Sequence, residues 1–110
     1  MKELLLEHLV IFMPDQFLSP ELHVQFGKRF GPLEGHPNLS SDDELPREIF
    51  ELKASKGGIA DEWHTDLTFR SSPAIMSIMH IVECPEFGGD TLWSSTYAAY
   101  EQLSTPMKDL

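Results

Sequence analysis

The chain has 110 residues, with 18 acidic against 8 basic side chains and a formal net charge of −10. This length fits one small domain or part of a larger one, and the negative charge argues against a nucleic-acid partner, because phosphate binding needs clustered lysines and arginines. The single cysteine excludes an internal disulfide, and no apolar run approaches the ~20 residues of a membrane span. We therefore expect a soluble, cytoplasmic protein without a nucleic-acid or membrane partner.

Helix signals occur near both ends of the chain. Residues 1–8 have the pattern of the tail of a helix. The segment 19–21, Ser-Pro-Glu, predicts a helix start, because it combines a hydroxyl cap, a proline at the first helical position and an acid in the first turn. Apolar residues then recur every four positions over 22–30 and form one face. A helix over 97–103 and a further one that opens at 104–106 are also expected.

Five short strands are predicted between and beside these helices. Each is an apolar or alternating run that is closed by a glycine or proline turn. They span 9–13, 49–53, 63–69, 74–82 and 90–93. This order predicts a mainly β fold with flanking helices, an α+β class.

His8, His23 and His80 are not interpreted as ligands. His8 and His23 lie in expected helices and are predicted to be solvated. His80 shares a face of the expected strand over 74–82 with apolar residues, which favours a packed sheet histidine over a ligand. Cys84 has no apparent partner acid or base, so a nucleophilic role is not expected.

The spacing of His64 and Asp66 points to metal chemistry. Residues i and i+2 of a strand project to the same face, so an imidazole nitrogen and a carboxylate oxygen can occupy adjacent positions on one ion. This donor pair suits iron in the two-histidine, one-carboxylate arrangement. Taken alone, the pattern is more often a surface histidine beside an aspartate, and a metal site with hydrolytic use stays open as an alternative.

The surroundings of this pair resemble a known family. The segment 63–69, Trp-His-Thr-Asp-Leu-Thr-Phe, is followed by Gly-Gly-Asp-Thr-Leu-Trp over 88–93. Together they resemble the TauD/TfdA family of iron(II)- and 2-oxoglutarate-dependent dioxygenases, and the resemblance extends from 10–15 through 30–37 to 98–104. It implies a partial double-stranded β-helix, or jelly roll, and an incomplete dioxygenase domain over 1–110 that is truncated at both ends. The family's third iron ligand, a histidine, and its 2-oxoglutarate arginine would lie downstream.

The resemblance also implies individual roles. His64 and Asp66 match the first two iron ligands and are the predicted catalytic and metal-binding residues. Thr91 matches the position whose hydroxyl helps to hold the distal carboxylate of 2-oxoglutarate. The predicted substrate-binding residues are His36, Leu39, Ala60 and Leu67. His36 matches a pocket histidine, whereas Leu39 and Ala60 stand where taurine dioxygenase has a tyrosine and an asparagine, which favours a larger and more apolar substrate than taurine.

The expected function is hydroxylation of a small, sulfonated or sulfated substrate with O2, Fe(II) as cofactor and 2-oxoglutarate as cosubstrate, releasing succinate and CO2. The isolated 110-residue chain is expected to be inactive, since only two of three metal ligands are present. Two further alternatives stay open beside the hydrolytic metal site. One is an inactive truncated chain, and the other is a binding module that keeps the sheet and completes its edges with another copy, as a homo-oligomer.

Overall fold

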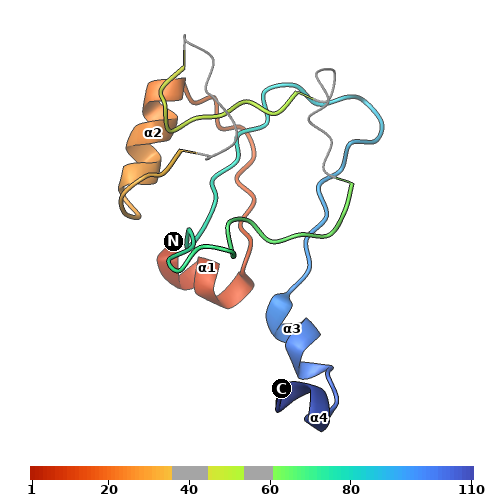
Figure 1. The fold of residues 1–110 in the computed structure, drawn as a ribbon. Helices are drawn as coiled ribbons and strands as arrows, with labels where there is room; N and C mark the ends of the chain where they lie inside the picture. Colours follow the sequence, from red (N-terminus) through yellow and green to blue (C-terminus); the bar gives the residue numbers. More distant parts are fainter. Residues whose placement is uncertain (36–44, 54–60) are drawn as a thin grey trace. The chain divides into compact units, whose positions relative to one another are not determined.

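The computed structural model describes residues 1–35, 45–53 and 61–110. These residues form four helices, drawn as coiled ribbons in Figure 1: α1 (Lys2–His8), α2 (Pro20–Lys28), α3 (Thr96–Glu101) and α4 (Thr105–Lys108). All four lie where the sequence predicts helices. None of the described helices is long and apolar enough to cross a membrane.

The predicted β architecture is wrong for the described residues. They contain no strand and no sheet, and Figure 1 draws no arrow. A strand requires a ladder of hydrogen bonds to a neighbouring strand. In the described turns, caps and loops, the backbone hydrogen bonds instead join residues at most four positions apart. The five segments have the residue types of strands, but none of them pairs with another described segment, so the expectation of a partial jelly roll is corrected as well.

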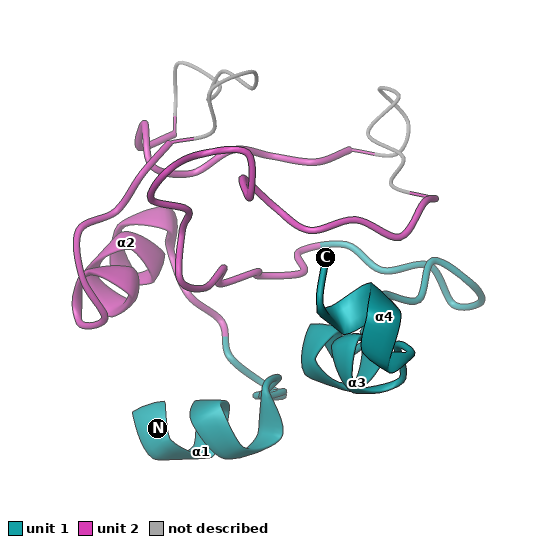
Figure 2. Cartoon of the chain, turned by 60° about the horizontal axis from the view of Figure 1, so that its bottom comes forward, with its two compact units in different colours: residues 1–16, 83–110 teal, residues 17–82 magenta. Residues whose placement is uncertain are grey.

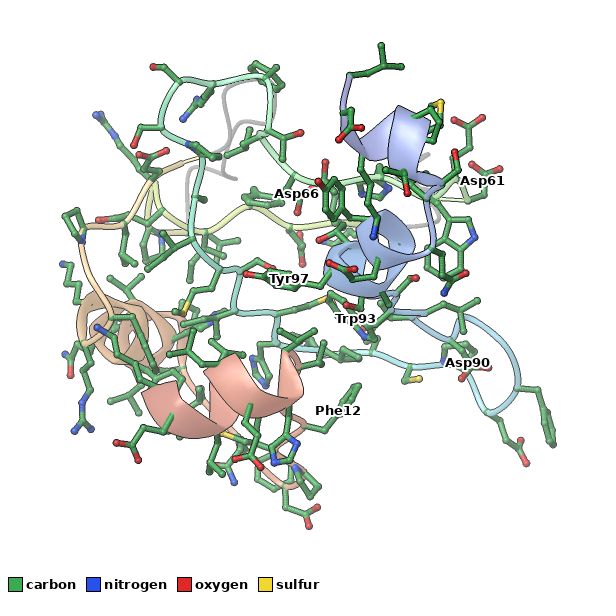
Figure 3. The ribbon with its side chains drawn as sticks, turned by 90° about the horizontal axis from the view of Figure 1, so that it is seen from below. Phe12, Asp61, Asp66, Asp90, Trp93 and Tyr97 are labelled. Atoms are coloured by element: carbon green, nitrogen blue, oxygen red, sulfur yellow. The ribbon has the colours of Figure 1, made fainter. Side chains whose placement is uncertain are left out.

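The chain divides into two compact units, coloured separately in Figure 2. Unit 1 consists of residues 1–16 and 83–110 and holds α1, α3 and α4. Within it, α3 and α4 are joined by Lys108, whose Nζ donates to Glu101 Oε2 at 2.8 Å and lies 5.3 Å from the centre of the Tyr100 ring. Figure 3 labels Trp93, before α3, and Tyr97, in the first turn of α3.

Unit 2, residues 17–82, is organised around α2. Gly27 is buried, and a Cβ atom at this position would lie 3.0 Å from Leu33 Cδ2 and 3.8 Å from Ile78 Cδ1. The prediction that His23 is solvated is wrong. Its Nε2 lies 3.1 Å from the Ile78 carbonyl oxygen, and its ring meets the His80 ring edge-to-face at 6.0 Å. The packed environment predicted for His80 therefore exists, with a helix rather than a sheet as its neighbour.

The segment that packs on α2 keeps a two-residue alternation without being a strand. Met76, Ile78 and His80 are half-buried, while the residues between them are exposed. This period of two is that of extended backbone. The sequence thus predicts which side chains share a face, although the hydrogen-bonded ladder is absent from the described residues.

No hydrophobic side chain is buried among the described residues. Large apolar side chains are instead exposed in both units, including Phe17, Phe69 and Phe87 at 90%, 78% and 84%. Burial of apolar surface is the main favourable term in folding, and here it is small. The helices are therefore held by caps and by a few side-chain contacts.

The cap of α2 gives a first testable prediction. The Ser19 Oγ accepts from the Leu22 N–H at 3.3 Å and donates to Glu21 Oε2 at 2.8 Å, and this second bond is the largest cause of the lowered pKa of Glu21. We expect Ser19→Ala to destabilise α2 by about 1 kcal/mol and to raise the Glu21 pKa toward its ordinary value. The stabilisation from the bond between Ser19 and the Glu21 carboxylate is fully present above the pKa that Glu21 has in the unfolded state. It is lost as the pH falls through the lower pKa of Glu21 in the folded state.

Carbon-13 NMR titration of the Glu21 carboxyl group and circular dichroism measure the two effects. Ser104→Ala is the matched control, because Ser104 precedes α4 and an early proline but makes no side-chain cap bond. An unchanged Glu21 pKa in Ser19→Ala would contradict the assignment.

Candidate metal site at His64 and Asp66

His64 and Asp66 lie close together within residues 61–70 of unit 2. His64 Nε2 is 3.6 Å from Asp66 Oδ1, and the two side chains are 56% and 67% exposed. Figure 3 labels Asp66 on this segment. The segment is not a strand, so the two side chains are brought together by their two-residue spacing between a bend at Glu62 and the turn after Asp66 rather than by a sheet face.

The ring orientation of His64 follows from a second contact. Its Nδ1 lies 2.8 Å from the Glu62 carbonyl oxygen. A carbonyl only accepts, so Nδ1 must carry the hydrogen, and in the neutral ring Nε2 then presents a lone pair. A backbone carbonyl on the second nitrogen is a common way to orient a metal-binding histidine.

This donor set fits a transition-metal ion. Two lone-pair donors, an imidazole nitrogen and a carboxylate oxygen, face each other beyond hydrogen-bond distance. Ligands of these types bind at about 2.0–2.2 Å, so two at right angles stand about 3 Å apart. The observed 3.6 Å needs only a small adjustment. The assignment of His64 and Asp66 as metal ligands and catalytic residues stays a prediction.

A closed turn follows directly after Asp66. Leu67, predicted to bind substrate, is half-buried and has a left-handed backbone with φ of 55°. The Arg70 N–H donates to the Leu67 carbonyl at 3.0 Å, and the hydroxyls of Thr65 and Thr68 lie 2.8 Å apart. These short-range bonds shape the backbone on which Asp66 is carried.

Thr91, the predicted 2-oxoglutarate residue, belongs to unit 1 and is exposed. It follows Gly88 and Gly89, whose φ angles of 77° and 74° lie in the left-handed region. Glycine adopts this region without steric cost, which agrees with the turn predicted there. The Thr91 hydroxyl makes no hydrogen bond to another described residue, so no such bond would compete with a bound carboxylate.

The remaining predicted residues, His36, Leu39 and Ala60, lie outside the described residues. Among those that are described, no third histidine, cysteine or acid joins His64 and Asp66 to make a three-ligand group. The role of the Glu62 carbonyl has no residue-type signal in the sequence, because any residue carries a backbone acceptor. Arg70 is also absent from the predicted site residues, since its only local signal is a cation four residues after Asp66.

The sequence of the chain was compared with those of known protein families. The family model described as "Taurine catabolism dioxygenase TauD, TfdA family" matches residues 1–110. The chain belongs to the TauD/TfdA family. The resemblance predicted from the segments at 63–69 and 88–93 is thereby confirmed.

Several relatives of this TauD/TfdA chain are named as dioxygenases, and one is named as an alkylsulfatase. It is 40% identical over 105 residues to an alkylsulfatase of Acinetobacter baylyi, covering 94% of this chain and 33% of the relative. It is 36% identical to an alpha-ketoglutarate-dependent sulfate ester dioxygenase of Pseudomonas putida (96% and 35% covered) and 31% identical to an alpha-ketoglutarate-dependent sulfonate dioxygenase of Saccharomyces cerevisiae (92% and 27%). The chain thus spans about a third of the length of these relatives. No solved structure matches it.

Proposed function

We propose that the protein carrying this sequence is an iron(II)- and 2-oxoglutarate-dependent dioxygenase that hydroxylates a small sulfated or sulfonated substrate. The observation that carries the proposal is the pair of facing donors, His64 Nε2 and Asp66 Oδ1, 3.6 Å apart in a chain of the TauD/TfdA family. The names of the relatives support the substrate class. Residues 1–110 would be one part of the dioxygenase domain, since those relatives are about three times as long.

Each residue has a separate task in this proposal. His64 and Asp66 would hold iron(II), and the Glu62 carbonyl keeps the proton on His64 Nδ1 so that Nε2 remains available. The Thr91 hydroxyl would donate to the distal carboxylate of 2-oxoglutarate, where an O–H donor suits an anionic acceptor. Bound iron supplies the oxidising chemistry, in which one atom of O2 enters a substrate C–H bond and the other enters succinate as CO2 leaves.

The substrate prediction rests on the sequence. His36 would donate to an anionic head group. Leu39 and Ala60 replace hydrogen-bonding side chains of taurine dioxygenase with apolar surface or space. A polar substrate group left without a buried partner loses much of its affinity, whereas each added methylene in an apolar pocket contributes modestly. We therefore propose a medium-chain alkyl sulfate or sulfonate rather than taurine.

Side-by-side turnover tests both parts of the proposal. With Fe(II), 2-oxoglutarate and O2, the protein carrying this sequence is expected to release succinate at least about 10-fold faster, by kcat/KM, with a medium-chain alkyl sulfate than with taurine. Omission of 2-oxoglutarate is the control and should abolish product. A clear preference for taurine would overturn the substrate prediction, and the absence of succinate release with any sulfated or sulfonated substrate would overturn the function.

A further inference from the structure

Arg70 connects the end of the turn that carries Asp66 to a distant part of unit 2. Its Nη1 donates to Glu34 Oε2 at 2.6 Å, and the two side chains are 32% and 49% exposed. The residues are 36 positions apart. The other ion pairs between described residues join positions at most seven apart. Arg70–Glu34 is therefore the ion pair that joins segments distant in the sequence.

The Arg70–Glu34 ion pair lies where it can affect the geometry of the candidate site. The Arg70 N–H closes the turn on the Leu67 carbonyl at 3.0 Å, and Leu67 directly follows Asp66. Backbone hydrogen bonds in the turns and loops of the described residues are all short-range, so they shape the turn but do not anchor it to the rest of the unit. A side-chain bond at Arg70 supplies such an anchor.

We propose that Arg70 is a positioning residue, whose ion pair with Glu34 fixes the turn after Asp66 and so sets the separation of the Asp66 carboxylate from His64 Nε2. The inference rests on the proposed function, in which these two groups hold iron. An exposed ion pair contributes little to global stability. The effect of breaking it is therefore expected in the site geometry and in metal affinity rather than in the unfolding transition.

The test is a double-mutant cycle in the protein carrying this sequence, with Co(II) as the metal probe. Arg70→Gln and Glu34→Gln are each expected to weaken Co(II) binding, followed by visible absorption, about two- to five-fold, the range of exposed ion pairs. The double neutral variant should bind no more weakly than either single one. Arg70→Lys should stay close to the parent, and the swap of Arg70→Glu with Glu34→Arg should restore affinity.

Glu51→Gln is the matched control. It breaks the Lys53–Glu51 pair of unit 2, an exposed ion pair with the same 2.6 Å distance, and should leave Co(II) affinity unchanged. Additive losses at Arg70 and Glu34, unchanged affinity in both, or an equal loss in Glu51→Gln would overturn the proposal.

A second readout needs no metal. In the metal-free protein, nitrogen-15 signals of the His64 ring and the carbon-13 signal of the Asp66 carboxyl should move in both neutral variants and return in the charge swap. If the parent binds no Co(II) but these signals respond, the proposed function fails and the positioning role stands. If the signals do not respond, the positioning role is wrong whatever the metal affinity.

Discussion

Replacement of either predicted iron ligand is expected to abolish substrate-dependent succinate release in the protein carrying this sequence. His64→Ala removes the nitrogen donor, and Asp66→Asn replaces an anionic oxygen by a neutral amide. Loss of a group that only orients a ligand costs about 10–100-fold in metal affinity or activity, so loss of a ligand itself should cost more than about 100-fold. Iron(II) affinity should fall in parallel.

Two substitutions outside the predicted ligand pair serve as matched controls for this experiment. His8→Ala removes a histidine from the exposed last turn of α1, and Asp61→Asn removes an exposed carboxylate from the same segment as Asp66. Both should keep activity within about two-fold, the usual scale of surface substitutions. Measurement combines succinate release with iron(II) binding. Full activity in His64→Ala would show that the facing donors do not hold the metal.

The 110-residue polypeptide by itself is expected to lack a cooperative unfolding transition and to release no succinate with substrate. Ordering a residue costs about 1–2 kcal/mol of backbone entropy, and burial of a large apolar side chain returns about 1.5–3 kcal/mol. No such side chain is buried among the described residues. Circular dichroism at 222 nm should therefore decline gradually on heating, and a dye that binds exposed apolar surface should fluoresce.

The Phe69→Ser variant distinguishes the absence of a cooperative unfolding transition from a cooperative transition at low temperature. Phe69 is 78% exposed, so the substitution should leave the thermal profile unchanged, whereas truncation of a core phenylalanine costs about 3–5 kcal/mol. A sharp transition of the monomer that moves to lower temperature in Phe69→Ser would refute the expectation.

The elements that could be predicted from the sequence are those with a short-range cause. The start of α2 depends on Ser19, its neighbouring proline and the N–H of Leu22, all within four positions. The proximity of His64 and Asp66 likewise depends on two-residue spacing. The sequence predicts this proximity on a strand, yet the two side chains are close where no strand forms, because a short sequence separation limits how far apart they can lie.

The features that escaped prediction depend on distant partners. Ladder formation over 74–82 requires a neighbouring strand, and residue type alone cannot supply it. The place of His23 in an expected helix predicts a solvated ring, whereas its acceptor, the Ile78 carbonyl, lies 55 positions away and has no local signal. The Arg70–Glu34 pair has no periodic or motif signal, since any of the 18 acidic residues could equally be its partner on sequence grounds.

The left-handed backbone at Leu67 also limits how this protein can be re-engineered. With φ at 55°, the position suits glycine or asparagine, and it penalises valine, isoleucine and threonine, whose branched Cβ crowds the neighbouring peptide. In a library with every residue type at position 67, variants with a β-branched residue should therefore be poorly folded, whatever their activity. Substitutions at Leu67, a predicted substrate-binding residue, therefore have to use unbranched or small side chains, or be combined with changes that reshape the turn.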